Sequence, residues 1–185
     1  LHVVAWQPEQ VKSAIGNAGT YDANNPDIRF SRTSAASVAD TDPWMAGSKA
    51  VDALGKPLIL YHGTATTFDQ FRAPRQGVYF SSEEEVAQAY AEYAVSKRKG
   101  NSPHVKQVHL AIRNPLVVNL RGGTYSYRGF ERALVKAKCA GYDGIQFRNV
   151  DDMPWGTSTT RSDVWVAFDT DQIRVVPPAA SLAQR

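Results

Sequence analysis

Apolar residues along the 185-residue chain recur with two different spacings, and each spacing predicts a different kind of element. Short runs rich in β-branched and aromatic residues, bounded by Gly, Pro, Asn or Asp, predict strands. These runs lie at 57–62, 77–81, 105–112, 115–120, 142–147, 164–169 and 172–176. Two longer segments, 81–100 and 129–141, instead place apolar residues three and four positions apart, which is typical of amphipathic helices.

The first of these helical segments carries signals at both ends. Ser81 or Ser82 can cap its N-terminus, and Ser82 followed by Glu85 has the spacing of a capping box. Gly100 is expected to end it, as Gly141 ends the second helix. The apolar face expected on the first helix consists of Val86, Ala89, Tyr90, Tyr93 and Ala94.

The order of these elements favours an α+β fold. Strands outnumber helices, and few strands are separated by a single helix in the manner of a tight βαβ unit. A parallel sheet covered by helices on both faces needs that alternation, whereas directly consecutive strands can pair antiparallel. We therefore expect a mostly antiparallel β core with flanking helices.

Composition divides the chain into three parts. Residues 16–50 are rich in Gly, Asn, Asp, Ser and Ala and lack sustained periodicity, which is typical of a linker. The segment VVAWQPEQVKS at 3–13 is similar to WVAFDTDQIRV at 165–175. The similarity arises by chance, or residues 3–13 are the end of a preceding domain that is similar to this one. Since the sequence starts with Leu1, we expect a longer parent protein. The expected division is 1–50 for the linker and the end of a preceding unit, 51–177 for the folded domain and 178–185 for a flexible tail.

The overall composition narrows the function classes only a little. Hydrophobic residues make up 43% of the chain, and no apolar run approaches the roughly 20 residues that cross a bilayer. The single cysteine, Cys139, excludes an internal disulfide and is expected to be a small buried side chain. No Cys/His group has zinc spacing, so no metal is expected. The net charge of +3 weakly favours an anionic partner.

The candidate chemistry lies in His62 of LYHGT, Tyr79 of GVYFSS and Tyr90 of the first helix. Two tyrosine rings can hold a flat heteroaromatic ring between them. Beside them, His62 offers a ring nitrogen, and the backbone of Gly63 can approach a ligand closely because it has no side chain. The nicotinamide end of NAD fits this description. Each of these residues, taken alone, also has an ordinary structural interpretation.

Four further motifs extend this pattern in a definite order: FDQF, RNPLVV, AKCAGYDGI and FDTDQI. Together the motifs resemble the diphtheria-toxin-like and poly-ADP-ribose-polymerase-like ADP-ribosyltransferases. They are most similar to the small domains embedded in bacterial and phage polyvalent and toxin proteins. The resemblance covers residues 56–176. It implies an ADP-ribosyltransferase-like fold of two packed sheets with flanking helices, and NAD as the substrate without a metal.

The resemblance also implies individual roles. His62 would bond a ribose hydroxyl of NAD, and the backbone of Gly63 would bond the nicotinamide carboxamide. Thr64 belongs to the same cofactor-binding motif. Tyr79 and Tyr90 would hold the nicotinamide ring between them, and His62 and Tyr79 would act in catalysis together with an acid.

That acid is where the chain departs from the family it resembles, in which a glutamate precedes a late strand. The last glutamate here, Glu131, lies within the second helix. Asp163 is the preferred candidate because it precedes the late strand with the family's spacing, although Asp is one methylene shorter than Glu. The alternatives are Asp151, Asp152 and Asp169.

The implied function is transfer of ADP-ribose from NAD to a macromolecular acceptor, a protein or a nucleic acid such as RNA, with release of nicotinamide. The alternatives are an NAD glycohydrolase and an inactive NAD-binding or interaction module of a phage or secreted polyprotein. A toxin or effector role in the cytoplasm of a target cell rests on the resemblance alone. So do delivery within a larger secreted or phage protein and a cognate immunity protein. No membrane partner is expected.

Two loops, 64–77 and 149–162, are expected to face the acceptor. Trp155 in the second loop would contact a base or a protein, or would simply fix the loop. Cations in and near these loops could form a basic rim that suits nucleic-acid phosphates, or a solvated rim without a partner. They are Arg72, Arg75, Lys97, Arg98, Lys99 and Arg161.

Overall fold

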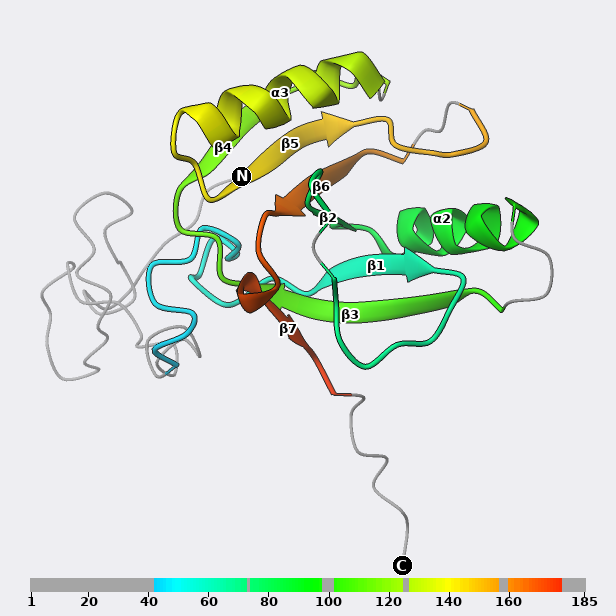
Figure 1. Cartoon of the computed structure of the whole chain (residues 1–185), viewed down its shortest axis with the longest axis horizontal. Coiled ribbons are helices and arrows are strands. Elements are labelled where there is room, and N and C mark those ends of the chain that lie inside the picture. The colour runs from blue at the N-terminus through cyan, green and yellow to red at the C-terminus, as the bar shows by residue number, and fades with distance from the viewer. Residues whose placement is uncertain (1–41, 73, 98–101, 125–126, 157–159, 178–185) are drawn as a thin grey trace, which may run out of the picture.

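The structure is a computed structural model that describes residues 42–72, 74–97, 102–124, 127–156 and 160–177. Within these residues seven strands and two α-helices form an α+β domain (Figure 1), and each element overlaps the segment predicted for it. The strands are β1 (Leu60–Thr64), β2 (Val78–Ser81), β3 (His104–Leu110), β4 (Pro115–Asn119), β5 (Gly144–Val150), β6 (Ser162–Ala167) and β7 (Ile173–Val175). The helices are α2 (Glu84–Lys97), α3 (Tyr127–Cys139) and the short 3-10 helix η2 (Thr170–Gln172).

The strands form one sheet in the order β4-β5-β6-β2-β1-β3-β7. Only β4 and β5 are parallel, so the mostly antiparallel core is confirmed. The expected division into two packed sheets is not confirmed. The sheet is nevertheless weakly joined at its centre, because β1 and β2 pair only through Tyr61 and Ser81. By contrast, β1 pairs with β3, and β2 with β6, along their whole lengths.

Alternation along β6 directs its side chains into two separate hydrophobic clusters. Val164 and Val166 join the cluster under α3, whereas Trp165 and Ala167 join the cluster on the other face. Such alternation is the rule for a strand with both faces covered. The α3 cluster also contains Phe130, Leu134, Ala137, Ile145 and Phe147. The opposite cluster contains Leu60, Phe80, Val108, Leu110 and Ile112.

The segment before β1 contributes to this core. Ser48 Oγ donates to Leu110 O at 2.7 Å, and the amide of Lys49 donates to Ile112 O at 2.6 Å. Met45 and Ala50 are buried. The last residues of the expected 1–50 linker therefore pack on the domain. The rest of that linker, with the similarity at 3–13, and the 178–185 tail lie outside the described residues.

The start of α2 differs from the prediction. Ser81 Oγ accepts the Glu83 amide at 3.0 Å, but the Ser82–Glu85 capping box is wrong. Ser82 instead extends the β2–β6 pairing, because its amide donates to Asp163 O and its Oγ accepts the Asp163 amide, both at 2.9 Å. The second correction concerns Cys139, which is exposed at the end of α3 rather than buried.

The buried face of α2 is also shifted from the predicted one, to Val86, Ala87 and Ala91. The cause is Gly63 on β1, over which α2 lies (Figure 1). A Cβ added at Gly63 would lie 1.9 Å from Ala87 O and 2.9 Å from Ala91 N. The helix backbone therefore rests directly on the strand, and small residues must face it.

No helix in the described part of the chain is both long and apolar enough to cross a membrane.

We expect Gly63→Ala to lower the free energy of unfolding by about 3 kcal/mol or more, because the obstructing atoms belong to backbone that cannot repack. Urea denaturation checks this. Gln107→Ala, an exposed side-chain change on the adjacent strand β3, is the control and should cost no more than about 0.5 kcal/mol. Equal stability of the two variants would contradict close contact between α2 and β1.

Candidate active site

A cavity of about 290 Å³ opens where β1 and β2 separate. It brings together five residues named from the sequence: His62 and Gly63 from β1, Tyr79 from β2, Tyr90 from α2, and Asp152, one of the alternative acids. The complete lining is Tyr61, His62, Gly63, Tyr79, Phe80, Ser81, Ala87, Tyr90, Asp152 and Val164. Thr64, also predicted, is not part of this lining; its Oγ1 donates to Thr66 O at 3.1 Å.

The imidazole of His62 spans the gap between the two strands. Its Nδ1 lies 2.8 Å from Tyr79 O. Since a carbonyl oxygen can only accept, Nδ1 carries the hydrogen and a neutral ring presents Nε2 as an acceptor. Burial lowers the pKa of His62, and the charge of Lys106 lowers it further, against the opposing effect of the bond to Tyr79. The site therefore holds a neutral histidine that accepts a hydrogen bond.

Three phenylalanines produce this burial. The rings of Phe68, Phe71 and Phe80 lie 6.2, 5.2 and 5.6 Å from the His62 ring, centroid to centroid. Phe68 and Phe71 are the two aromatic residues of the FDQF motif. Their spacing of three residues is compatible with a turn that returns both rings to one partner, but only the structure identifies that partner as His62.

The two tyrosines of the cavity are supported from different sides. The Tyr79 ring lies 6.2 Å from Phe130 of α3, and Phe130 stacks on Phe147 at 3.8 Å. Tyr90 Oη donates to Asp152 Oδ1 at 2.5 Å. The hydrophobic core under α3 therefore supports one ring, and a buried carboxylate orients the other.

Asp152 is only 5% exposed and is the acid that lines the cavity. Burial raises its pKa, and the nearby charge of Asp151 adds to this, whereas the bond from Tyr90 lowers it. Asp151 is also buried, and its carboxylate pairs with Arg161 at 3.6 Å. Both residues are alternatives that the sequence offers for the acid, and the structure places Asp152 in the cavity lining and Asp151 in an ion pair.

Asp163 does not line the cavity. Its Oδ2 accepts from Gln146 Nε2 at 2.9 Å, and its Oδ1 accepts the Asn149 amide at 3.1 Å. Asn149 has a φ of 53° and lies in the bulge of β5 that precedes the acidic pair. Asp163 thus supports the bulge, which redirects the chain toward Asp152. The remaining candidate, Asp169, caps η2.

The four basic residues of the expected rim that the structure describes do not gather at one place. Arg72 lines a hollow of about 1120 Å³ that adjoins the cavity through His62 and Tyr79. Lys97 lies over the Tyr93 ring, and Arg161 pairs with Asp151. Arg75 lines a hollow beside α3 through its backbone carbonyl, whereas Arg98 and Lys99 lie outside the described residues.

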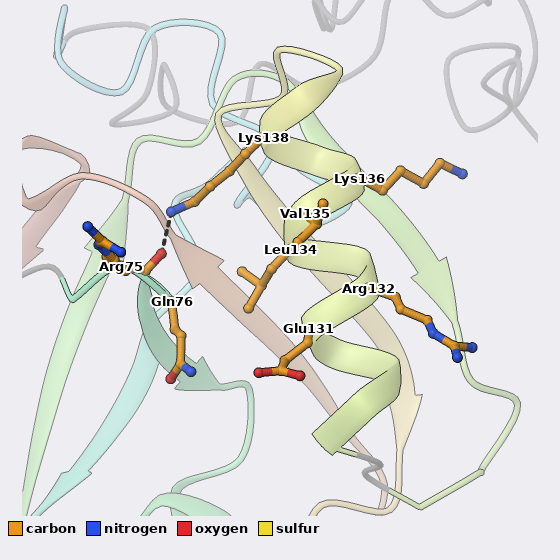
Figure 2. A pocket seen from close by; sticks show the side chains of 8 residues that line it. All are labelled: Arg75, Gln76, Glu131, Arg132, Leu134, Val135, Lys136 and Lys138. Carbon is orange, nitrogen blue, oxygen red and sulfur yellow. Dashed lines mark hydrogen bonds between the residues drawn. The ribbon is translucent and has the colours of Figure 1, made fainter.

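A further hollow, of about 660 Å³, lies between the turn at Arg75 and α3 (Figure 2). Lys138 Nζ closes one end by donating to Arg75 O. Its acid, Glu131, is exposed, and no aromatic ring lines it. It therefore lacks the buried acceptor and aromatic walls of the cavity at His62, and we do not place the active site there.

Among the described residues, no group of three or more His, Cys, Asp or Glu side chains is arranged to hold a metal ion.

The comparisons with known proteins agree with the motifs. A model of the family described as ADP-Ribosyltransferase in polyvalent proteins matches residues 52–178, more than half of the chain. No curated protein matches the chain significantly.

We expect wild type to lose stability relative to His62→Gln as the pH falls below 6.5. Because the pKa of His62 is lowered by folding, the unfolded chain takes up the proton first. The stabilisation that comes from a neutral His62 is thus fully present above pH 6.5, the pKa of an ordinary histidine. As the pH falls from there toward the folded-state pKa, the free energy of unfolding decreases by up to about 1.4 kcal/mol per pH unit. Urea denaturation of both proteins between pH 8 and pH 5 measures the difference; parallel curves would contradict a buried neutral His62.

Proposed function

The chain belongs to the ADP-ribosyltransferases of polyvalent proteins, and from this we propose that it takes ADP-ribose from NAD and transfers it to a macromolecular acceptor. A domain of this family is a transferase. The observation that carries the proposal is the cavity that gathers a neutral His62, two tyrosines and a buried carboxylate.

The dimensions and walls of the cavity suit the nicotinamide end of NAD. A volume of about 290 Å³ is at the lower end of the range for small-molecule sites, so it suits one half of a dinucleotide. Tyr79 and Tyr90 provide aromatic walls for the ring, and the backbone of Gly63 provides polar groups for the carboxamide. The adjoining hollow at Arg72 leaves room for the rest of the dinucleotide.

The reaction needs stabilisation of positive charge more than it needs a protein nucleophile. The bond between the nicotinamide nitrogen and ribose C1′ breaks, and its electron pair leaves with the nicotinamide. Positive charge develops on C1′ and the ring oxygen until an acceptor nucleophile bonds to C1′ and gives up a proton. A fixed carboxylate beside this charge acts mainly in the transition state. His62 Nε2, as an acceptor, would orient the ribose through a hydroxyl.

We assign the carboxylate role to Asp152 rather than to Asp163, which its spacing from the late strand favours. Three observations support the change: Asp152 lines the cavity, its Oδ1 is fixed by Tyr90, and its neighbour Asp151 is paired with Arg161. Asp163, in contrast, uses both oxygens to hold Gln146 and the β5 bulge.

Asp152→Asn should reduce nicotinamide release from NAD by about 100-fold or more, because the neutral amide cannot stabilise the developing cation. His62→Gln should also reduce release, through lost orientation of the ribose. Asp163→Asn is the matched control. It keeps an oxygen for the Asn149 amide and should cost less than about tenfold. The measurement is nicotinamide produced by the purified domain.

A large loss in Asp163→Asn with little loss in Asp152→Asn would return the acid role to Asp163. No release by wild type, with or without cell lysate as a source of acceptors, would indicate an inactive interaction module.

We expect NAD labelled in its ADP-ribose part to leave label on macromolecules of a cell lysate. Digestion of parallel samples with protease or nuclease then identifies the acceptor class. Free ADP-ribose as the sole product, with nicotinamide release intact, would identify a glycohydrolase and contradict the transfer step. A toxin or effector role, action in a target cytoplasm, delivery within a larger protein and an immunity partner remain predictions from the family resemblance.

A further inference from the structure

An aromatic pair, one ring exposed and the other half-buried, lies next to the cavity. Trp155, in the loop between β5 and β6, is 59% exposed. Its ring meets the Tyr93 ring of α2 edge to face, with centroids 4.9 Å apart and planes at 77°. Lys97 Nζ lies 5.1 Å from the centroid of the same Tyr93 ring. We call Trp155, Tyr93 and Lys97 the aromatic platform.

Two segments connect the platform to the cavity wall. In each of them, a platform residue follows a cavity residue by three positions. On α2, Tyr93 follows the cavity residue Tyr90 by three positions, a rise of about 4.5 Å. On the loop, Trp155 follows Asp152 by three positions. Since Tyr90 bonds Asp152 and Tyr93 contacts Trp155, the two segments run side by side from the cavity to the surface. A molecule on the platform is therefore adjacent to the proposed reacting centre.

Fixing the loop does not account for the exposure of Trp155. The bond from Tyr90 to Asp152 and the ion pair between Asp151 and Arg161 already hold the loop. A tryptophan that served only to anchor it would gain most by burying its whole ring, as Trp165 does. Trp155 keeps more than half of its surface available to a partner.

We infer that the aromatic platform binds the acceptor, and that this acceptor is a single-stranded nucleic acid. Exposed aromatic rings stack on unpaired bases of any sequence, while a neighbouring cation holds the phosphates. Lys97 provides that cation, and the sequence continues with Arg98 and Lys99. The net charge of +3 favours the same polyanion. The inference rests on the proposed transfer of ADP-ribose, since it names the acceptor of that reaction.

The test is binding of a fluorescently labelled single-stranded RNA or DNA oligonucleotide of mixed sequence, followed by anisotropy without NAD. Trp155→Leu should weaken binding by about 5- to 100-fold, because a base cannot stack on an aliphatic side chain. Trp155→Phe keeps an aromatic face and should remain within about tenfold of wild type. If Trp155 served apolar contact with a protein instead of base stacking, the Leu and Phe variants would bind the oligonucleotide equally well. Urea denaturation confirms that each variant is folded.

Salt dependence provides an independent measurement. Lys97→Gln should reduce the slope of log K against log salt by about 0.7, the value for one phosphate contact on a single strand. Lys136→Gln is the matched control, because Lys136 is also an exposed helix lysine but lies on α3 beside the other hollow (Figure 2). Its slope and affinity should stay at the wild-type values.

Three results would overturn the inference: no oligonucleotide binding by wild type, equal losses in Trp155→Leu and Trp155→Phe, or equal losses in Lys97→Gln and Lys136→Gln. Measuring nicotinamide release by wild type in parallel distinguishes failure of the acceptor inference from failure of the proposed transferase function. Release without oligonucleotide binding removes only the acceptor inference. Oligonucleotide binding without release removes the transferase mechanism and leaves the platform as a nucleic-acid-binding surface without an acceptor role.

Discussion

The hydrogen bond from His62 Nδ1 to Tyr79 O is the interaction on which the rest of the site depends. It lies where the central strands β1 and β2 have stopped pairing, so a side chain takes over a backbone carbonyl that sheet pairing would otherwise satisfy. The same bond fixes the tautomer of His62 and thereby makes Nε2 an acceptor. A gap in the sheet is thus converted into a defined polar site, and the phenylalanines around the ring keep it neutral.

The sequence predicted the elements well and their long-range arrangement poorly. Apolar spacing located the strands and helices, and the order of motifs indicated His62, Gly63, Tyr79 and Tyr90. The separation of β1 from β2 was not predictable, since local patterns do not say how far two distant segments stay paired. The capping box at Ser82 failed for a similar reason: its hydrogen-bonding groups are used by Asp163, which is 81 residues away.

Spacing alone does not show which acid lines the cavity. Asp163 has the expected distance from the late strand, but its carboxylate serves the bulge of β5. That bulge then directs Asp152 inward, where Tyr90 meets it. The two carboxylates therefore differ in their surroundings: that of Asp163 accepts hydrogen bonds from Gln146 and Asn149, whereas that of Asp152 lines the cavity. The partner of Asp152 lies on α2, 62 residues away, whereas the partners of Asp163 lie on β5, 17 and 14 residues away.

The direct contact between the α2 backbone and Gly63 has a consequence for how a ligand enters and leaves. With no side chain between helix and strand, there is no compressible layer along which α2 could slide or lift away from β1. The position of Tyr90 relative to His62 is therefore set by backbone contact between α2 and β1. A molecule that enters the cavity meets a wall whose placement does not depend on how side chains pack between the helix and the strand.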